Sequence, residues 1–86
     1  MPTISIFWGI LIQMYWGEHL PPHFHCKYGE YKCSININTI ELLKGEMPKR
    51  TLNGILEWAK IHQQELLDNW ELCQKSLPPN KIKPLE

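Results

Sequence analysis

The feature that most constrains the fold is an alternation of polar and apolar residues over positions 23–38, interrupted at Gly29-Glu30. Successive strand residues point to opposite faces, and two such runs around a two-residue, glycine-first loop predict a β-hairpin. The residue numbers of two antiparallel partners around this loop add up to the same value along the hairpin, so Tyr28 pairs with Tyr31 and His23 with Asn36. The apolar face then carries Phe24, Cys26, Tyr28, Tyr31, Cys33, Ile35 and Ile37. The polar face carries His23, His25, Lys27, Lys32, Ser34, Asn36 and Asn38.

Strands are also predicted on both sides of this hairpin. Residues 6–16, IFWGILIQMYW, are rich in β-branched and aromatic side chains and predict one buried strand. Residues 40–47 predict a further short strand, ended by Gly45 or Pro48.

The apolar period changes from Thr51 onward, where apolar residues recur at three- and four-residue steps to about residue 76. This spacing predicts one long amphipathic helix, or two with a break near His62. Thr51 is the expected N-cap, and Pro78-Pro79 stops the helix.

These elements predict an α+β fold. A small antiparallel sheet of three to four strands is followed by one long helix or two C-terminal helices, packed on the apolar face of the sheet. We expect residues 1–77 to form a single domain and residues 78–86 a proline-rich tail with little to fold around.

Composition narrows the setting of the protein. Nine basic residues balance nine acidic ones, so no global charge attracts the chain to nucleic acid or to an anionic membrane. The cysteine count is odd, with no Cys-x-x-Cys pair, and the N-terminus has no secretion signal. The apolar run from Ile4 to Ile12 is far shorter than the ~20 residues of a spanning helix. We therefore expect a cytoplasmic chain without membrane contact.

The polar face of the hairpin has the residues of acid–base chemistry on RNA. Histidine exchanges protons near neutral pH, and lysine holds phosphate and stabilises charge that develops on it. The catalytic candidates are His23 and His25 as acid and base, with His19 as an auxiliary. The candidates for phosphate or nucleic-acid binding are Lys27, Lys32, Lys49 and Arg50, and Lys44 extends the same patch.

Two other interpretations of the histidines stay open. Solvent-facing strand positions are polar in most sheets, so His23 and His25 are equally consistent with a purely structural role. A His-x-His pair on one strand face also suits a metal, and Gly17, His23, His25 and Glu30 match the first half of the cupin signature. No second histidine motif follows, so we expect no cofactor; in a metal site, His19 would join His23 and His25.

The large apolar residues and the cysteines are expected in the core. Trp8, Trp16, Trp58 and Trp70 supply most of the bulk of a short chain. Trp58 lies off the main helical stripe and is therefore the candidate contact for a partner protein. Cys26 and Cys33 face each other on the apolar side of the hairpin, and Cys73 lies on the apolar helical stripe, so all three are expected to be buried thiols.

Several blocks of the chain resemble the small prokaryotic family known as domain of unknown function 4160. They are MPTIS, GILIQMY, PPHFHCKYGEYK, ILEWAKIHQQELLDNWEL and KIKPLE, and together they span essentially the whole chain. Many members are encoded beside another small protein in pairs that look like toxin–antitoxin modules, and some are labelled transcriptional regulators. The resemblance therefore implies a toxin-like protein with a cognate, antitoxin-like partner.

The sequence thus predicts a toxin-like component that engages RNA through its hairpin face, as a metal-independent ribonuclease in the enzymatic version. The first alternative is a non-catalytic nucleic-acid-binding regulator or protein adaptor. The second is a metal-dependent enzyme that uses the His-x-His pair.

Overall fold

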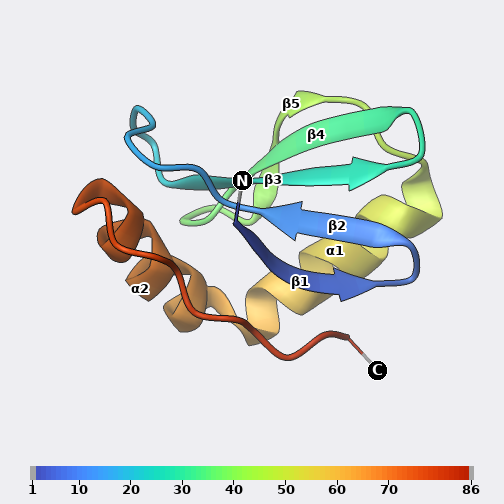
Figure 1. Cartoon of the computed structure of the whole chain (residues 1–86). Coiled ribbons are helices and arrows are strands. Elements are labelled where there is room, and N and C mark those ends of the chain that lie inside the picture. The colour runs from blue at the N-terminus through green and yellow to red at the C-terminus, as the bar shows by residue number, and fades with distance from the viewer. Residues whose placement is uncertain (1, 86) are drawn as a thin grey trace.

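The computed structural model, which describes residues 2–85, contains one antiparallel sheet followed by two helices (Figure 1). The strands are β1 (Thr3–Phe7), β2 (Ile10–Gln13), β3 (His23–Tyr28), β4 (Tyr31–Asn36) and β5 (Glu41–Gly45). The helices are α1 (Lys49–Ile61) and α2 (Gln63–Gln74). The strand order in the sheet is β1-β2-β3-β4-β5, so each strand pairs with its sequence neighbour. The α+β fold class is confirmed, with five strands where three to four were expected.

The additional strand comes from residues 6–16, which do not form one strand. Trp8 and Gly9 have positive φ angles of 55° and 77° and form a tight turn between β1 and β2. Such a turn gives both central residues positive φ, a conformation that is uncommon for tryptophan. The Trp8 ring packs over α1 at Gly54, where an added Cβ would lie 2.4 Å from Cζ3 of Trp8. The turn thus occurs together with a tertiary contact to α1, and the apolar sequence of residues 6–16 gives no sign of it.

The second hairpin has the expected register throughout. β3 and β4 pair from His23 with Asn36 to Tyr28 with Tyr31, and Gly29 opens the turn with a φ of 58°. β5 ends at Gly45, as the sequence predicts. The alternation of residues 23–38 therefore places each side chain of the hairpin on the expected face.

The helical region breaks at His62, which confirms the two-helix alternative. α1 begins at Lys49 with Pro48 as its N-cap, so the prediction of Thr51 as N-cap is wrong. A proline at this position loses nothing by lacking an N–H, because the first N–H groups of a helix have no partner within the helix. Within residues 2–85, no helix is long and apolar enough to cross a bilayer.

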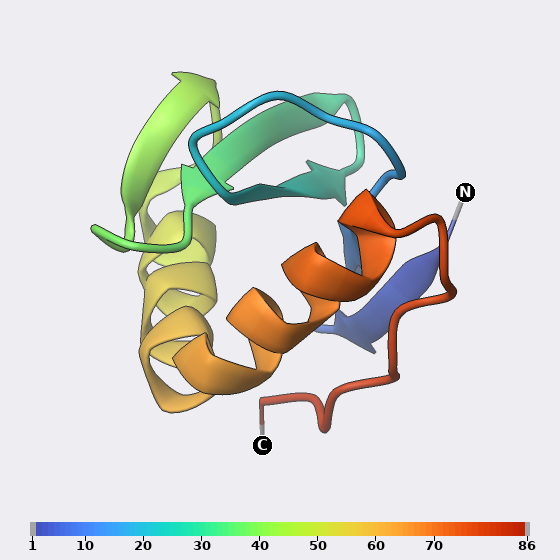
Figure 2. The same ribbon diagram turned by 90° about the vertical axis from the view of Figure 1, so that its left-hand side faces the viewer.

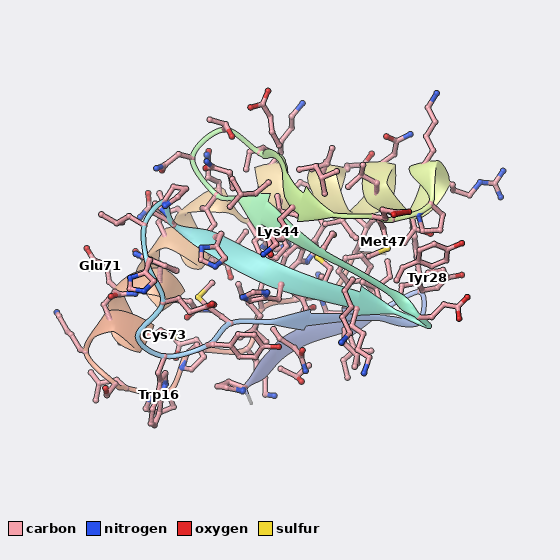
Figure 3. All side chains as sticks on the ribbon, turned by 90° about the horizontal axis from the view of Figure 1, so that it is seen from above. Trp16, Tyr28, Lys44, Met47, Glu71 and Cys73 are labelled. Atoms are coloured by element: carbon pink, nitrogen blue, oxygen red, sulfur yellow. The ribbon has the colours of Figure 1, made fainter. Side chains whose placement is uncertain are left out.

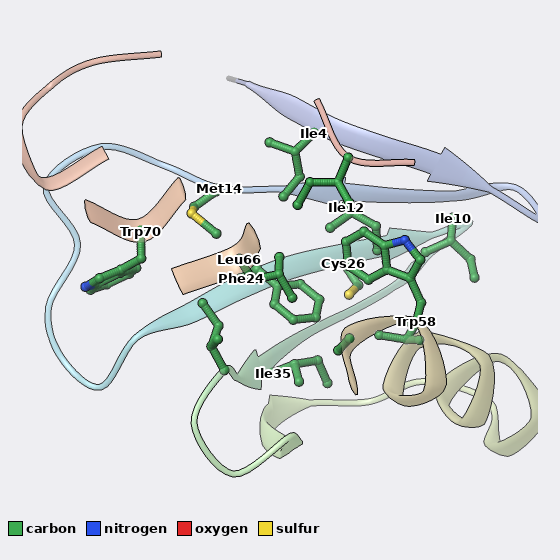
Figure 4. Packing of buried hydrophobic residues seen from close by; sticks show 14 of the residues in the cluster. Ile4, Ile10, Ile12, Met14, Phe24, Cys26, Ile35, Trp58, Leu66 and Trp70 are labelled. Atoms are coloured by element: carbon green, nitrogen blue, oxygen red, sulfur yellow. The ribbon is translucent and has the colours of Figure 1, made fainter. Parts of the chain in front are cut away.

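Both helices pack on one face of the sheet, which curves over them (Figures 1 and 2). Trp58 of α1 lies at the centre of this core, fully buried, with its ring centroid 5.4 Å from that of Phe7 and 5.8 Å from that of Phe24 (Figure 4). Its Nε1–H donates a hydrogen bond to the carbonyl of Lys83. The prediction of Trp58 as a partner contact is therefore wrong, because the buried face of α1 runs through Trp58 and Ala59.

The four tryptophans divide into two pairs. Trp58 and Trp70 are buried, whereas Trp8 and Trp16 are 55% and 53% exposed. The expectation that Trp8 and Trp16 belong to the core is wrong, because the turn at Trp8 reverses the chain and the loop of Trp16 lies outside the sheet. Trp16 donates its Nε1–H to the carbonyl of Leu77 and so joins that loop to the end of α2.

The C-terminal segment folds against the rest of the chain, contrary to expectation. Ile82 is buried and donates its backbone N–H to the carbonyl of Ile4 on the outer edge of β1. The side chain of Asn69 pairs with both the N–H and the carbonyl of Asn80. The segment therefore covers an edge strand that would otherwise present unpaired backbone groups.

Candidate anion-binding groove and histidine cluster

A shallow groove of about 530 Å³ lies on the face of the sheet that the helices leave open. We call it the lysine groove, after Lys27 of β3, Lys32 of β4 and Lys44 of β5, which line it together with His25 and Ser34. The sheet register brings these residues together, because Lys27 pairs with Lys32 and Ser34 pairs with Lys44. Figure 3 looks down on this face, with Lys44 over the strands.

The lysine groove is positively charged, and the nearest acids lie beyond its lining: Glu18 contacts His25, and Glu30 and Glu46 line a smaller hollow with Lys32. No aspartate or glutamate lines it, and within residues 2–85 no carboxylate forms an ion pair with Lys27, Lys32 or Lys44. Lys27 and Lys32 are directly opposite each other on adjacent strands, an arrangement that destabilises a sheet. This cross-strand repulsion opposes the pairing of β3 and β4, and an anion bound between the two lysines would offset it.

An aromatic side chain borders the same groove. Tyr15 follows β2, and its ring centroid lies 4.4 Å from that of His25. Its hydroxyl donates to Oε1 of Gln13, which also lines the groove. Exposed rings beside lysines are the usual surroundings of an unpaired base in proteins that bind single strands.

Glu18, His23 and His25 converge at one end of the groove; we call them the histidine cluster. Oε1 of Glu18 lies 2.6 Å from Nε2 of His25 and 3.4 Å from Nε2 of His23. One ligand atom from each residue lies within 4.8 Å of the other two. All three side chains are partly buried, with His23 the least exposed. Two imidazoles and a carboxylate therefore face a common point.

The loop that carries Glu18 is attached to α2, far away in the sequence. The Nε2 amide of Gln74 donates to the backbone carbonyl of Glu18, and Trp16 donates to Leu77. The same loop contains the cis peptide bond between Leu20 and Pro21. The position of Glu18 thus depends on two long-range hydrogen bonds, whose partners are separated by 56 and by 61 positions in the sequence.

Each imidazole of the cluster uses its other ring nitrogen as well. Nδ1 of His23 lies 2.8 Å from the carbonyl of Pro21, which only accepts, so Nδ1 donates. The His23 ring also packs against Trp70, at 5.3 Å between centroids. Nδ1 of His25 lies 3.4 Å from Oγ of Ser34, which either donates or accepts. These contacts orient both Nε2 atoms toward Glu18.

The structure brings together only part of the predicted site. His23 and His25 meet in the cluster, and Lys27 and Lys32 meet in the groove, joined by Lys44.

His19 is exposed and lies outside the cluster, where Glu18 takes the place expected for it. Glu30, which completes the partial cupin pattern, lies in the turn at the far end of the hairpin. The sequence pattern missed Glu18, because its only local signal is an acid shortly before Pro-Pro-His.

Lys49 and Arg50 do not line the groove. They lie in the first turn of α1, which packs on the covered face of the sheet. Lys49 and Arg50 are therefore close to Lys44 in the sequence but do not lie on the face of the sheet that carries Lys44.

The three cysteines are free and buried, as expected. Burial raises the pKa of the Cys73 thiol, and the negative charge of Glu18 raises that pKa further. Burial also raises the pKa of Cys26, with a contribution from its neighbour Cys33. A hydrogen bond from Cys26 lowers the pKa of Cys33, which is itself buried in the sheet. Buried thiols of this kind belong to the packing of the core.

Comparison with known proteins identifies a family. The model of a family described as "Domain of unknown function (DUF4160)" matches residues 9–71. The matched region contains the second hairpin, the histidine cluster and α1. No curated protein and no solved structure matches the chain.

Proposed function

Because this chain belongs to the DUF4160 family, a domain of unknown function, we propose its function from the site itself: it binds single-stranded RNA in the lysine groove. We further propose that it is the toxin-like half of a two-protein module, held inactive by a cognate partner protein. The observation that carries the proposal is the set of unneutralised lysines that three adjacent strands contribute to one groove.

Single-stranded RNA fits the chemistry of this groove. The lysines carry the positive charge that attracts phosphates, and the rings of Tyr15 and His25 border the groove where a base can stack. The groove lies on an open sheet face, a common platform for unpaired bases.

Binding, rather than cleavage, is the function that the geometry supports best. A metal-independent ribonuclease needs one group to take a proton and a second group to give one. His25 lines the groove, whereas His23 lies beside Trp70 and is not among the lining residues. Cleavage by His23 and His25 therefore stays a prediction, which the measurements of RNA integrity below test.

The edge strand β5 supports the partner half of the proposal. All five of its residues are exposed, including Leu42 and Leu43. An exposed edge strand pairs readily with a strand of another chain. A partner that adds a strand beside β5 would lie next to Lys44, and acidic side chains on it would compete with RNA for the groove.

Salt-dependent binding of a labelled, unstructured RNA tests the groove. We expect the triple variant Lys27→Ala, Lys32→Ala, Lys44→Ala to bind more weakly. The slope of log affinity against log salt should fall by about two, since each phosphate contact on a single strand contributes ~0.7. Fluorescence anisotropy at several salt concentrations measures both quantities.

The matched control removes the same charge elsewhere. Lys49, Arg50 and Lys60 are exposed on α1, away from the groove, so their replacement by alanine should leave the slope nearly unchanged. An equal loss in both triple variants would show that net charge, and not the groove, binds RNA.

Expression in cells tests the module. We expect the chain alone to slow growth, and the neighbouring gene product to restore growth and to co-purify with the chain. Cellular RNA that stays intact in growth-arrested cells, with toxicity unchanged in His23→Ala and His25→Ala, would support binding without cleavage. Normal growth at high expression would contradict the toxin assignment, whatever the RNA affinity.

A further inference from the structure

We propose that Glu18, His23 and His25 form a binding site for one divalent transition-metal ion of the zinc type. The proposal does not depend on whether the lysine groove binds RNA. It rests on the distances between the three donor atoms, on the hydrogen bonds that orient the two imidazoles, and on the way the fold holds these groups together.

The donor atoms are spaced as metal ligands require. Ligands bound at ~2.0–2.1 Å to a tetrahedral zinc ion lie about 3.3 Å from one another. The distance from Glu18 Oε1 to His23 Nε2 is 3.4 Å, and the one to His25 Nε2 is 2.6 Å, a hydrogen-bond length. Replacing that proton by a metal ion lengthens the second distance by less than about 1 Å. The two imidazole nitrogens lie within 4.8 Å of each other, so they approach each other as the ion binds.

The hydrogen bond of His23 is the second observation that points to a cation. Its Nδ1–H donates to the Pro21 carbonyl, so in the neutral ring Nε2 carries a lone pair directed at Oε1 of Glu18. Two acceptors 3.4 Å apart repel each other unless a proton or a metal ion lies between them. Donation of the other ring N–H to a backbone carbonyl is also the usual arrangement of a metal-bound histidine.

His25 can present its Nε2 lone pair and still keep its contact with Ser34, while the metal ion takes the place of the proton in its hydrogen bond to Glu18. Nδ1 of His25 faces Oγ of Ser34, and a hydroxyl accepts from Nδ1–H as readily as it donates to an unprotonated Nδ1. When metal displaces the proton of Nε2, the ring can therefore shift to the other tautomer and keep its bond to Ser34. Both imidazoles thus have a partner that suits the metal-bound form.

The fold holds the three ligands from different parts of the chain. Glu18 is fixed by Gln74 of α2, His23 packs against Trp70, and His25 packs against Tyr15. Two imidazoles and one carboxylate suit zinc, iron, nickel or cobalt better than calcium or magnesium, which prefer oxygen. Three protein ligands leave one tetrahedral position for water or for a ligand. That position is beside the groove, because His25 lines both sites.

A second histidine–carboxylate pair provides an internal control. His62 and Glu65, one turn apart at the start of α2, lie 2.6 Å from each other between Nδ1 and Oε1. This distance equals the one between His25 and Glu18, but within residues 2–85 no third ligand joins the pair. If metal ions bound to any histidine–carboxylate pair, they would therefore bind to His62 and Glu65 as well as to the histidine cluster.

Calorimetric titration of the chelator-treated, full-length chain with Zn²⁺ alone tests the proposal. We expect one ion per chain, a rise in Tm with Zn²⁺, and visible absorption of the Co²⁺ form typical of four-coordinate cobalt. Glu18→Gln keeps the size of the side chain but removes its charge, and should weaken Zn²⁺ binding by at least about 100-fold. His23→Ala should do the same, whereas His62→Ala should bind like the parent.

Three results would overturn the proposal. They are no saturable binding by the parent chain, unchanged affinity in Glu18→Gln, and an equal loss in His62→Ala. If His23→Ala does not fold, as judged by its near-ultraviolet circular dichroism, Glu18→Gln carries the test. Nitrogen NMR of the imidazoles gives an independent readout: a His23 ring that stays doubly protonated at neutral pH with Zn²⁺ present would show an ion pair with Glu18 and no metal site.

Discussion

The two faces of the sheet are built from the same strands but follow different physical rules. The covered face carries apolar side chains such as Phe24 and Ile35, each fully buried against the helices. The open face has two lysines directly opposite each other and a carboxylate between two imidazoles. Hydrophobic burial accounts for the first face. The second face has like charges on paired positions, an arrangement that opposes folding and that our proposal of anion binding would explain.

The largest effect is expected on the covered face, at Trp58. Replacing Trp58 by alanine removes a fully buried ring that contacts Phe7 and Phe24, together with its hydrogen bond to Lys83. We expect a loss of about 3–5 kcal/mol in the free energy of unfolding, measured by urea denaturation. Trp16→Ala is the matched control: that ring is half-exposed, and its single hydrogen bond predicts a loss of about 1 kcal/mol. If both variants lose the same free energy of unfolding, the division into buried and exposed tryptophans is wrong.

An intermediate effect is expected where the first turn meets α1. Gly54→Ala places a methyl group 2.4 Å from Cζ3 of Trp8, so the ring must move and the free energy of unfolding should fall by about 1–3 kcal/mol. In a Trp8→Ala background the same substitution should raise it by about 0.5–1 kcal/mol, because alanine is the better helix former. A double-mutant cycle by urea denaturation measures this change of sign. Additive effects would show that the Trp8 ring does not occupy this space.

The smallest effect is expected on the open face, with the opposite sign. Lys32→Glu places an acid opposite Lys27 and should stabilise folding by about 0.5 kcal/mol at low salt. The gain should shrink at high salt, since exposed charges are screened. The same change should weaken RNA binding. The double variant Lys27→Glu, Lys32→Glu restores repulsion and should lose the gain; if it is as stable as Lys32→Glu, the cross-strand pair is not the cause.

The comparison between the two hairpins shows where prediction from the sequence succeeds. Gly29 signals a turn, and the flanking residues alternate strictly, so the register of β3 and β4 follows without tertiary information. The turn at Trp8-Gly9 lies within an apolar run that reads as one strand. A bulky residue rarely adopts positive φ, and here its ring packs against a helix that begins some forty residues later.

The candidate site divides in the same way. His23, His25, Lys27 and Lys32 share a face because of strand periodicity, which the sequence alone reveals. Lys44 joins them through the pairing of β5, whereas Lys49 and Arg50 belong to the helical layer. Trp58 lies off the stripe that the apolar spacing predicts, but the buried face of α1 is wide enough to include it together with Ile55 and Ala59.

The sequence by itself determined the hairpin, the separation of thiols from histidines and lysines, and the amphipathic helical region after Thr51. These features depend on periodicity within an element, which is local. Only the tertiary structure decided that Glu18, and neither His19 nor Glu30, completes the histidine cluster. The position of Glu18 depends on hydrogen bonds from Gln74 and between Trp16 and Leu77. No pattern within a loop specifies contacts with residues more than fifty positions away, because those contacts exist only after α2 has packed on the sheet.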